Sequence, residues 1–234
     1  MLVKLTVENY KSFDQKEELN LISSSKIQSN KSHQFRIKQT TLLKHAVIYG
    51  ANASGKSNLV STLGFIKEVL IEGLPASSVN DFCKNRIENK DRDSIFEIQF
   101  TVGNNFYAYG FSALLSKKMI TEEWLYELKQ NGSYHNLFSR EADNPPTLGD
   151  GVNPSKTEKN RFSVYSEDFS GHKSQLFLTE MNRGKKYEEN SKLMFFADTF
   201  RWIINNVVVI NPRMGILNTD TFYKSDSLES ISQL

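Results

Sequence analysis

Apolar and polar residues are arranged differently in successive parts of the chain, and each arrangement predicts a different element. Residues 2–7 alternate over most of their length, which is typical of a half-buried strand, and residues 13–22 can form a second strand. The unbroken apolar run at 46–49 predicts a buried strand. Residues 56–71 then carry apolar side chains at helical spacing, with Gly73 marking the end of the predicted helix.

In the middle of the chain the pattern changes to a period of two, which favours strands. We expect strands over 95–100, 106–111 and 119–128, then a hairpin at Asn131-Gly132 with a returning strand over 134–138. Parallel strands need long connections, whereas most of these candidates are joined by short turns that contain Gly or Asn. The sequence therefore predicts an antiparallel meander outside the parallel core.

The remaining segments give weaker patterns. Residues 141–160 contain several Pro and Gly residues and are interpreted as a loop, and 162–165 as a short strand. A short strand is also expected at 35–37, and the apolar run at 207–210 predicts another buried strand. A helical pattern develops from Tyr187, with apolar residues mostly at three- and four-residue steps: Leu193, Phe196, Phe200, Ile203 and Ile204.

A glycine-rich motif lies between an apolar run and the predicted long helix. Residues 50–57 read Gly-Ala-Asn-Ala-Ser-Gly-Lys-Ser, a complete G-x-x-x-x-G-K-S phosphate loop in a strand–turn–helix context. Gly50 and Gly55 let backbone N–H groups converge on an anion, and the positive end of the helix reinforces that site. Lys56 would reach the β- and γ-phosphates, and Ser57 would place its hydroxyl on Mg²⁺.

A chance glycine turn is the alternative interpretation of this motif. Both glycines, the Lys-Ser pair and the flanking elements would then have to coincide, so we set that alternative aside. The motif indicates a nucleotide-binding protein that takes ATP and Mg²⁺, with Ser57 as the metal ligand. The predicted nucleotide-binding residues are Gly50, Ala51, Asn52, Ala53, Ser54, Gly55, Lys56, Ser57 and Asn58.

Composition narrows the class of protein without changing this interpretation. The 234 residues are 38% hydrophobic and 12% aromatic, which suits a folded core and argues against disorder. With 29 Lys and Arg against 27 Asp and Glu, the net charge of +2 is too balanced to indicate nucleic-acid binding. The single cysteine, Cys83, excludes an intrachain disulfide and a multi-cysteine metal site, and His33 and His45 have no partner at ligand spacing. The chain has no signal-peptide pattern and no apolar run of membrane-spanning length, so we expect a soluble cytoplasmic protein.

The first part of the chain resembles a known branch of ATPases. An opening strand, the segment 9–13 (Asn-Tyr-Lys-Ser-Phe) and a phosphate loop with Asn52 inside it together resemble the SMC, RecF and OLD branch of the ABC-type ATPases. In that branch the basic residue of the first element lies near the nucleotide, which implies that position for Lys11. A surface lysine at a strand end is the other interpretation of Lys11, and the sequence leaves both open.

The middle of the chain narrows the resemblance. Residues 107–111, 120–126 and 137–141 look like the AAA-annotated ATPases of bacterial abortive-infection and phage-defence systems, which are relatives of the OLD nucleases. Trp124 and the tyrosines of these segments also fit ordinary packing in a sheet. The similarity therefore says which family the segments belong to, and it assigns them no chemistry.

The resemblance implies an α/β fold of the P-loop NTPase class, with an ABC-ATPase-like first lobe, a mixed core sheet, an antiparallel β-meander and flanking helices. It implies one partial ABC-type ATPase domain over 1–234. The parts of this domain are N-terminal strands, phosphate loop and helix (1–75), an antiparallel insertion (94–140), and a helix and strand (187–211). It also implies a homodimer formed through the ATPase head and an effector protein such as a nuclease. DNA or RNA is left open as a further partner, and no membrane is implied.

Hydrolysis in this family needs groups that the sequence does not offer in the expected form. Asp198 follows an apolar run, as a Walker B carboxylate does, but the run has helical spacing and Thr199 stands where a glutamate is expected. Residues 170–172 (Ser-Gly-His) lack the second glycine of the signature motif. Gln175 is the candidate for the glutamine that touches Mg²⁺ in ABC-type ATPases, because Gln99 lies in a predicted strand. An exposed loop glutamine is the alternative for Gln175.

Two hypotheses about function therefore remain. The chain is either the ATP-binding N-terminal segment of an ABC-type ATPase that regulates a defence or DNA-processing effector, or a non-hydrolysing, nucleotide-dependent regulatory or assembly module. In the first case the chain is a fragment or a separate polypeptide completes its site. A P-loop kinase or GTPase fits less well, because no Asn-Lys-x-Asp motif is present and the long antiparallel section does not suit a small-molecule kinase.

Overall fold

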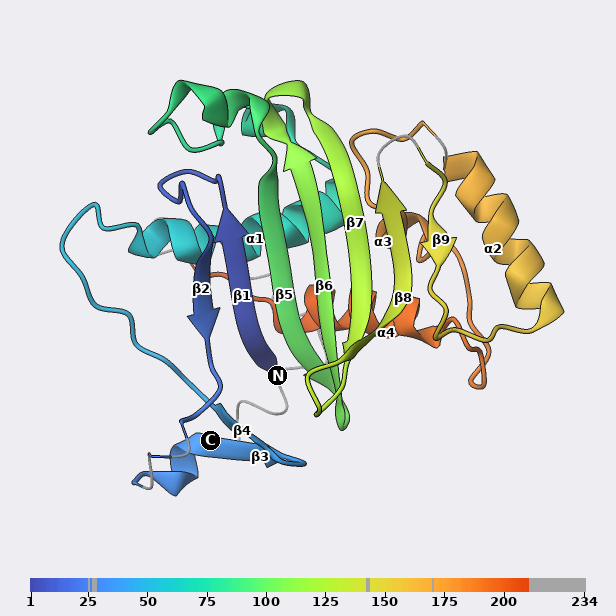
Figure 1. The fold of residues 1–234 in the computed structure, drawn as a ribbon, viewed down its shortest axis with the longest axis horizontal. Coiled ribbons are helices and arrows are strands. Elements are labelled where there is room, and N and C mark those ends of the chain that lie inside the picture. Colours follow the sequence, from blue (N-terminus) through green and yellow to red (C-terminus); the bar gives the residue numbers. More distant parts are fainter. Residues whose placement is uncertain (25, 27–28, 142–143, 170, 211–234) are drawn as a thin grey trace.

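The computed structural model describes residues 1–24, 26, 29–141, 144–169 and 171–210. Its centre is a seven-stranded sheet with the order β2-β1-β5-β6-β7-β8-β9, in which every neighbouring pair is antiparallel (Figure 1). A separate hairpin of β3 and β4 lies below this sheet in the same view. The strands are β1 Leu2–Glu8, β2 Glu17–Asn20, β3 Gln34–Ile37, β4 Thr40–Leu43, β5 Ser94–Val102, β6 Asn105–Leu114, β7 Met119–Leu128, β8 Tyr134–Glu141 and β9 Thr147–Leu148.

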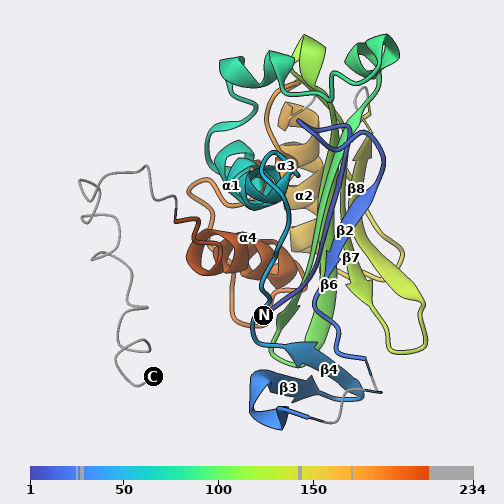
Figure 2. The same ribbon diagram turned by 90° about the vertical axis from the view of Figure 1, so that its left-hand side faces the viewer.

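The helices gather on one face of the sheet. Figure 2 shows α1, α3 and α4 on the same side of the strands, with α2 beyond the β8–β9 edge in Figure 1. The α-helices are α1 Lys56–Glu72, α2 Lys156–Phe169, α3 Phe177–Glu180 and α4 Met194–Asn206, and short 3-10 helices span Lys31–His33, Ala76–Asn80, Ile87–Asp91 and Leu115–Lys117. Of the helices described, none is long and apolar enough to cross a membrane.

The core lies between this face of the sheet and the helices. In β5, Phe96, Ile98 and Phe100 are fully buried, whereas the residues between them point to the other face, as the period of a strand requires. The Phe96 ring packs against the rings of Phe65 of α1 and Phe111 of β6, with ring centroids 5.0 and 5.1 Å apart. The predicted antiparallel meander is thereby confirmed, and its apolar face explains why it packs against helices.

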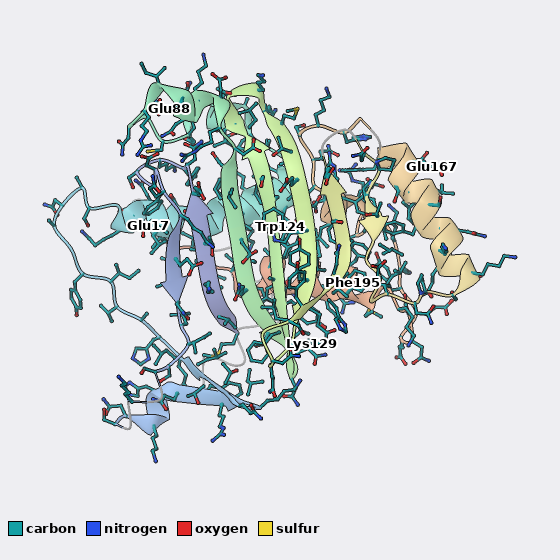
Figure 3. The ribbon with its side chains drawn as sticks, in the orientation of Figure 1. Glu17, Glu88, Trp124, Lys129, Glu167 and Phe195 are labelled. Carbon is teal, nitrogen blue, oxygen red and sulfur yellow. The ribbon has the colours of Figure 1, made fainter. Side chains whose placement is uncertain are left out.

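The opposite face of the sheet carries a tryptophan over a glycine. Trp124 of β7 pairs with Gly110 of β6, and a Cβ added to Gly110 would lie 2.5 Å from the indole ring, so the flat ring requires a glycine beneath it. The indole N–H donates to the carboxylate of Glu97 at 3.0 Å. Figure 3 shows Trp124 near the middle of the sheet. This tryptophan has a packing role, as its pattern in the sequence allowed.

A buried carboxylate joins the sheet to α3. Glu123 is fully buried and accepts hydrogen bonds from the Tyr109 hydroxyl at 3.0 Å and from the backbone N–H groups of Phe177 and Leu178 at 2.6 and 3.0 Å. Burial raises the pKa of Glu123, while the charge of Arg140 and the two backbone donors oppose that rise. The carboxylate thus takes up backbone donors that would otherwise be buried without partners.

Arg140 completes the same connection from β8. Its guanidinium donates to the backbone carbonyls of His172 at 2.6 Å and Gln175 at 2.8 Å, and it lies 4.7 Å from the centre of the Phe169 ring. One Arg140 nitrogen is 3.9 Å from the Glu123 carboxylate. Together, the two charged residues fix the segment that leads into α3 against the meander.

The expected mixed core sheet is wrong for the described residues, because both described sheets are antiparallel throughout. The two apolar runs that predicted buried strands, 46–49 and 207–210, form none. Instead, Val47, Tyr49 and Ile210 are 67%, 88% and 75% exposed. A strand needs a neighbour for its backbone N–H and C=O groups, and the described part of the chain supplies no neighbour for either run.

Two shorter predictions also change. Residues 162–165 belong to helix α2, because Phe162, Ser166 and Phe169 recur at helical spacing and are buried on one side. The second predicted strand is confined to β2, Glu17–Asn20. The predicted long helix is confirmed as α1 and the late helical pattern as α4, whereas the expected end of the last segment, residue 211, lies outside the described residues.

Candidate functional site

The glycine-rich loop leads directly into the N-terminus of α1. Gly55 caps this helix with φ of 92°, a left-handed conformation that favours glycine. A Cβ on Gly55 would also lie 2.9 Å from the Ser12 hydroxyl oxygen and 3.5 Å from the Phe13 ring. Both the backbone angle and the close neighbours therefore require a glycine here, as the motif predicts.

The ammonium group of Lys56 is turned back onto the loop. It donates to the carbonyl oxygens of Gly50 at 2.7 Å and Ala51 at 2.6 Å, and to the Ser54 hydroxyl at 3.3 Å. The loop that these contacts close is solvent-exposed, and Ala53 has a positive φ of 63°. The positive charge is thus held within the loop by neutral acceptors, which a phosphate could replace with a stronger, charged partner.

A tight turn from the N-terminal segment lies against the loop and α1. Tyr10 and Phe13 exchange two backbone hydrogen bonds of 2.9 Å, so residues 11–12 form the tip of a hairpin. At this tip the Ser12 hydroxyl accepts from the Asn58 side chain at 2.9 Å. Asn58 and Lys11 were predicted from the sequence, whereas Ser12 was not, although it lies within the segment 9–13 that carries the family resemblance.

Lys11 lies beside α1 in the described structure. It has a positive φ of 51°, and its ammonium donates to the Ser61 hydroxyl on the second turn of α1 at 3.3 Å. It also lies 5.1 Å from the centre of the Tyr10 ring. The fold thus brings Lys11 to the helix that follows the phosphate loop, although its contact is with the helix side and not with residues 50–57.

Asn9 fixes the base of this turn and was missed as a structural residue. Its fully buried side chain donates to the carbonyls of Asn89 at 2.9 Å and Arg92 at 2.8 Å, and it accepts from the backbone N–H of Cys83 at 3.2 Å. All of its side-chain contacts are to backbone groups of the connector between α1 and β5. Asn9 therefore holds the turn, and with it Ser12, in place beneath the loop.

The structure does not bring Gln175 to the loop. Its Cγ atom lies 3.3 Å from the position of a Cβ on Gly73, which is the residue that ends α1, and the Gly73–Leu74 end is held by the Ser174 carbonyl. Helix α1 has 17 residues and begins at Lys56, so its two ends are about 25 Å apart at 1.5 Å per residue. A direct contact of Gln175 with a nucleotide in the loop has no support in this arrangement.

Asp198 also lies away from the loop. Its helix, α4, packs at the start of β1: Trp202 stacks on Phe100 with centroids 4.4 Å apart, and Phe100 pairs with Leu2. The turn beneath the phosphate loop follows the other end of β1, seven residues on, which places the two about 20 Å apart along the strand. The helical spacing that argued against a Walker B role for Asp198 is confirmed by α4.

The residues at the loop fit a nucleotide and its metal by their chemistry. Gly50 and Gly55 have no side chain that would cover the loop backbone. A Cβ on Gly50 would lie 2.7 Å from the Ser54 hydroxyl oxygen, so this position suits a glycine. The helix N-terminus adds donors without a helical acceptor, and Lys56 supplies a positive charge within the loop. Ser57 carries an exposed hydroxyl, the kind of oxygen ligand that Mg²⁺ accepts. Among the described residues, no group of three or more His, Cys, Asp or Glu side chains could hold a metal ion.

A part of the chain that includes the phosphate loop is similar to a known protein family. Residues 46–150 match the family model described as "AAA domain, putative AbiEii toxin, Type IV TA system". Over this segment the chain is similar to an AAA-annotated ATPase domain of the abortive-infection type. No curated protein matches the chain.

The AAA domain match covers the structural features described above. It begins at the apolar run before the phosphate loop and includes the loop, α1 and the strands β5 to β8. The similarity suggests nucleotide binding of the ATPase kind, with which a divalent metal is typically associated. Helices α2, α3 and α4 follow the matched segment, as does the stretch containing Gln175 and Asp198.

Proposed function

We propose that this chain binds ATP with Mg²⁺ in the loop 50–57, as the nucleotide-binding part of an ABC-type ATPase that controls a defence or DNA-processing effector. The observation that supports the proposal is the loop 50–57, which Lys56 closes by its hydrogen bonds. Lys56 lies over the carbonyls of Gly50 and Ala51 at the mouth of a helix N-terminus, and glycines stand where side chains would collide.

Each loop residue has a defined task in this proposal. Backbone N–H groups of the loop and of the first turn of α1 would donate to phosphate oxygens. The Lys56 ammonium would leave its neutral acceptors in the loop and bind a phosphate oxygen instead. The Ser57 hydroxyl would be a ligand of Mg²⁺, which would neutralise part of the phosphate charge when bound. Asn58 and Ser12 hold the loop against the N-terminal turn through their 2.9 Å hydrogen bond.

A second candidate function is a regulatory or assembly module that binds nucleotide without hydrolysing it. The placement of Asp198 favours it, because this carboxylate lies near the start of β1 and away from Ser57. Phosphoryl transfer depends on positioned charge and on an oriented water, and in the described part of the chain neither Asp198 nor Gln175 is placed to complete the site beside Ser57. Under the ATPase proposal, a second polypeptide chain or a second head brings that carboxylate.

Titration of labelled ATP tests the binding site. Lys56→Ala should weaken ATP affinity by roughly 1.5–3 kcal/mol, the worth of a charge-assisted contact. Lys159→Ala is the matched control, since Lys159 is an exposed lysine of α2 away from the loop. Equal ATP affinity in the wild type and the Lys56→Ala variant would refute the assignment of the loop.

A phosphate-release assay separates the two candidate functions. The chain alone should bind ATP but turn it over negligibly, and its sedimentation should be compared with and without ATP to detect a dimer. Turnover by the chain alone that Lys56→Ala abolishes would place a complete catalytic site within these residues and would contradict the regulatory alternative. ATP turnover that appears only when a partner polypeptide is added would support the ATPase proposal in which a second chain completes the catalytic site.

A further inference from the structure

Two histidines that are far apart in the sequence lie side by side in the fold. The imidazole rings of His33 and His45 have centroids 4.6 Å apart and planes inclined by 58°. The chain has four histidines, and the other two, His135 and His172, lie on β8 and before α3. His33 and His45 are twelve positions apart, which is not a spacing typical of metal ligands on one helix or strand, so the sequence did not predict this contact.

The β3–β4 hairpin creates the contact. The register pairs Gln34 with Leu43, and beyond this pair the backbone N–H of Lys44 donates to the carbonyl of His33 at 2.9 Å. The two histidines therefore flank the base of the hairpin, where the chain leaves it toward the phosphate loop. Their proximity follows from backbone pairing, so it does not depend on the conformations of long side chains.

The two rings are available for a ligand. Both residues are exposed, and in the described part of the chain neither ring forms a salt bridge or a side-chain hydrogen bond. Imidazole nitrogens are the commonest protein ligands for divalent transition metals. With metal–nitrogen distances of about 2.0–2.1 Å, two imidazoles on one tetrahedral ion have ring centroids roughly 5 Å apart, close to the observed separation.

We propose that His33 and His45 bind a divalent transition-metal ion of the zinc class. Two imidazoles supply two coordination positions and water supplies the others, so the affinity should be lower than that of a closed four-ligand site. This site differs in chemistry from the loop, because Mg²⁺ prefers oxygen ligands and binds imidazole poorly. A bound ion would clip the base of the hairpin and so fix the start of the segment that leads to residues 50–57.

Calorimetric titration of the tag-free, nucleotide-free chain with Zn²⁺, and separately with Ni²⁺, tests the proposal. The wild type should bind about one ion, and His33→Gln and His45→Gln should each reduce the affinity at least about tenfold, because each removes one of two ligands. Mg²⁺ alone should give no heat from this site. Both substitutions are on exposed residues, so circular dichroism should show an unchanged fold.

The matched control is His135→Gln, which removes an exposed histidine of β8 without touching the pair. This variant should bind Zn²⁺ and Ni²⁺ like the wild type. Cu²⁺ electron paramagnetic resonance gives an independent readout, since the signature of nitrogen ligation should be present in the wild type and lost in the His33→Gln His45→Gln double variant. Binding that survives in the double variant, or no binding of Zn²⁺ or Ni²⁺ to the wild type at millimolar concentration, would overturn the proposal.

Discussion

The meander and the phosphate loop are neighbours in sequence but differ in how they are held. In the meander, Phe96, Ile98 and Phe100 are fully buried and every strand has a hydrogen-bonded partner on each side except at the edges. Around the loop, the run at 46–49 is exposed, and no strand of the described residues lies beside it. Consecutive strands of the meander are joined by short turns and pair with one another, whereas the described residues supply no strand that pairs with the segment before the loop.

Helix α1 belongs to both regions. Its buried face, with Phe65, Ile66, Val69 and Leu70, packs against the meander, and its exposed N-terminus carries the loop. The packed core thus fixes the phosphate loop at the end where it enters α1, whereas the segment before the loop is exposed. Such an arrangement suits a binding loop, because the scaffold positions the helix N-terminus while the loop remains accessible to a ligand.

The largest expected contrast between the two regions comes from two aromatic truncations. Phe96→Ala should lower the free energy of unfolding by about 3–5 kcal/mol, because it opens a cavity among Tyr10, Phe65 and Phe111. Tyr49→Ala should change it by no more than about 0.5 kcal/mol, because Tyr49 is 88% exposed. Urea unfolding of both variants checks this. A loss of stability in Tyr49→Ala comparable to that in Phe96→Ala would show that the run at 46–49 is packed in solution.

The buried charges of the meander give the next largest effect. Glu123→Ala should cost about 3–5 kcal/mol of unfolding free energy, because it leaves the Tyr109 hydroxyl and two backbone N–H groups buried without their acceptor and removes the negative charge beside Arg140. Glu122→Ala, one residue away on the exposed face of β7, is the matched control and should cost under about 0.5 kcal/mol. Chemical denaturation measures both, and similar losses in the two variants would contradict the role of Glu123.

Two glycines of the α1 region should respond to alanine with opposite signs. Gly55→Ala should destabilise the chain by about 1–2 kcal/mol, because the residue has φ of 92°. Gly64→Ala should stabilise it by about 0.5–1 kcal/mol, because it lies within the helix and a Cβ there would meet only Val209 at 3.7 Å. Thermal unfolding of the two variants measures the sign of each stability change. A stabilised Gly55→Ala variant would mean that the loop adopts another conformation.

The smallest effect concerns a surface carboxylate that lies outside both regions. Hydrogen bonds, first of all from the Ser191 hydroxyl, lower the pKa of Glu158 to about 2. Because the folded pKa lies below the unfolded value of about 4.5, this contribution to stability is present above pH 4.5 and is lost as the pH falls toward 2. Solvent screens this partly exposed group, so Glu158→Gln should cost less than about 1 kcal/mol near neutral pH and nothing near pH 2.

The control for this pH dependence is Glu167→Gln, which changes an exposed carboxylate of the same helix (Figure 3). The stability difference between the wild type and Glu158→Gln, measured by urea unfolding at several pH values, should shrink on acidification, and the Glu167→Gln variant, which keeps the hydrogen bond of Ser191 to Glu158, is measured beside it. A Glu158→Gln difference that grows as the pH falls would contradict the stated sign.

The sequence by itself determined those features whose causes are local. The phosphate loop follows from glycine spacing and from the helix that begins at Lys56, and the meander from its period of two and its short turns. The family similarity of residues 46–150 rests on the same segments. Local backbone preferences and turn chemistry act over a few residues, so a single sequence displays them directly.

Only the tertiary structure decided the features that depend on distant partners. The run at 46–49 has the composition of a buried strand, yet burial requires a neighbouring strand that the described residues do not provide. Residues 162–165 became helical because Phe162 and Phe169 pack on one side of α2. The role of Asn9, the position of Gln175 at the far end of α1 and the contact of His33 with His45 all join segments separated along the chain. Side-chain contacts of this kind depend on how the elements pack, so a local sequence pattern does not predict them.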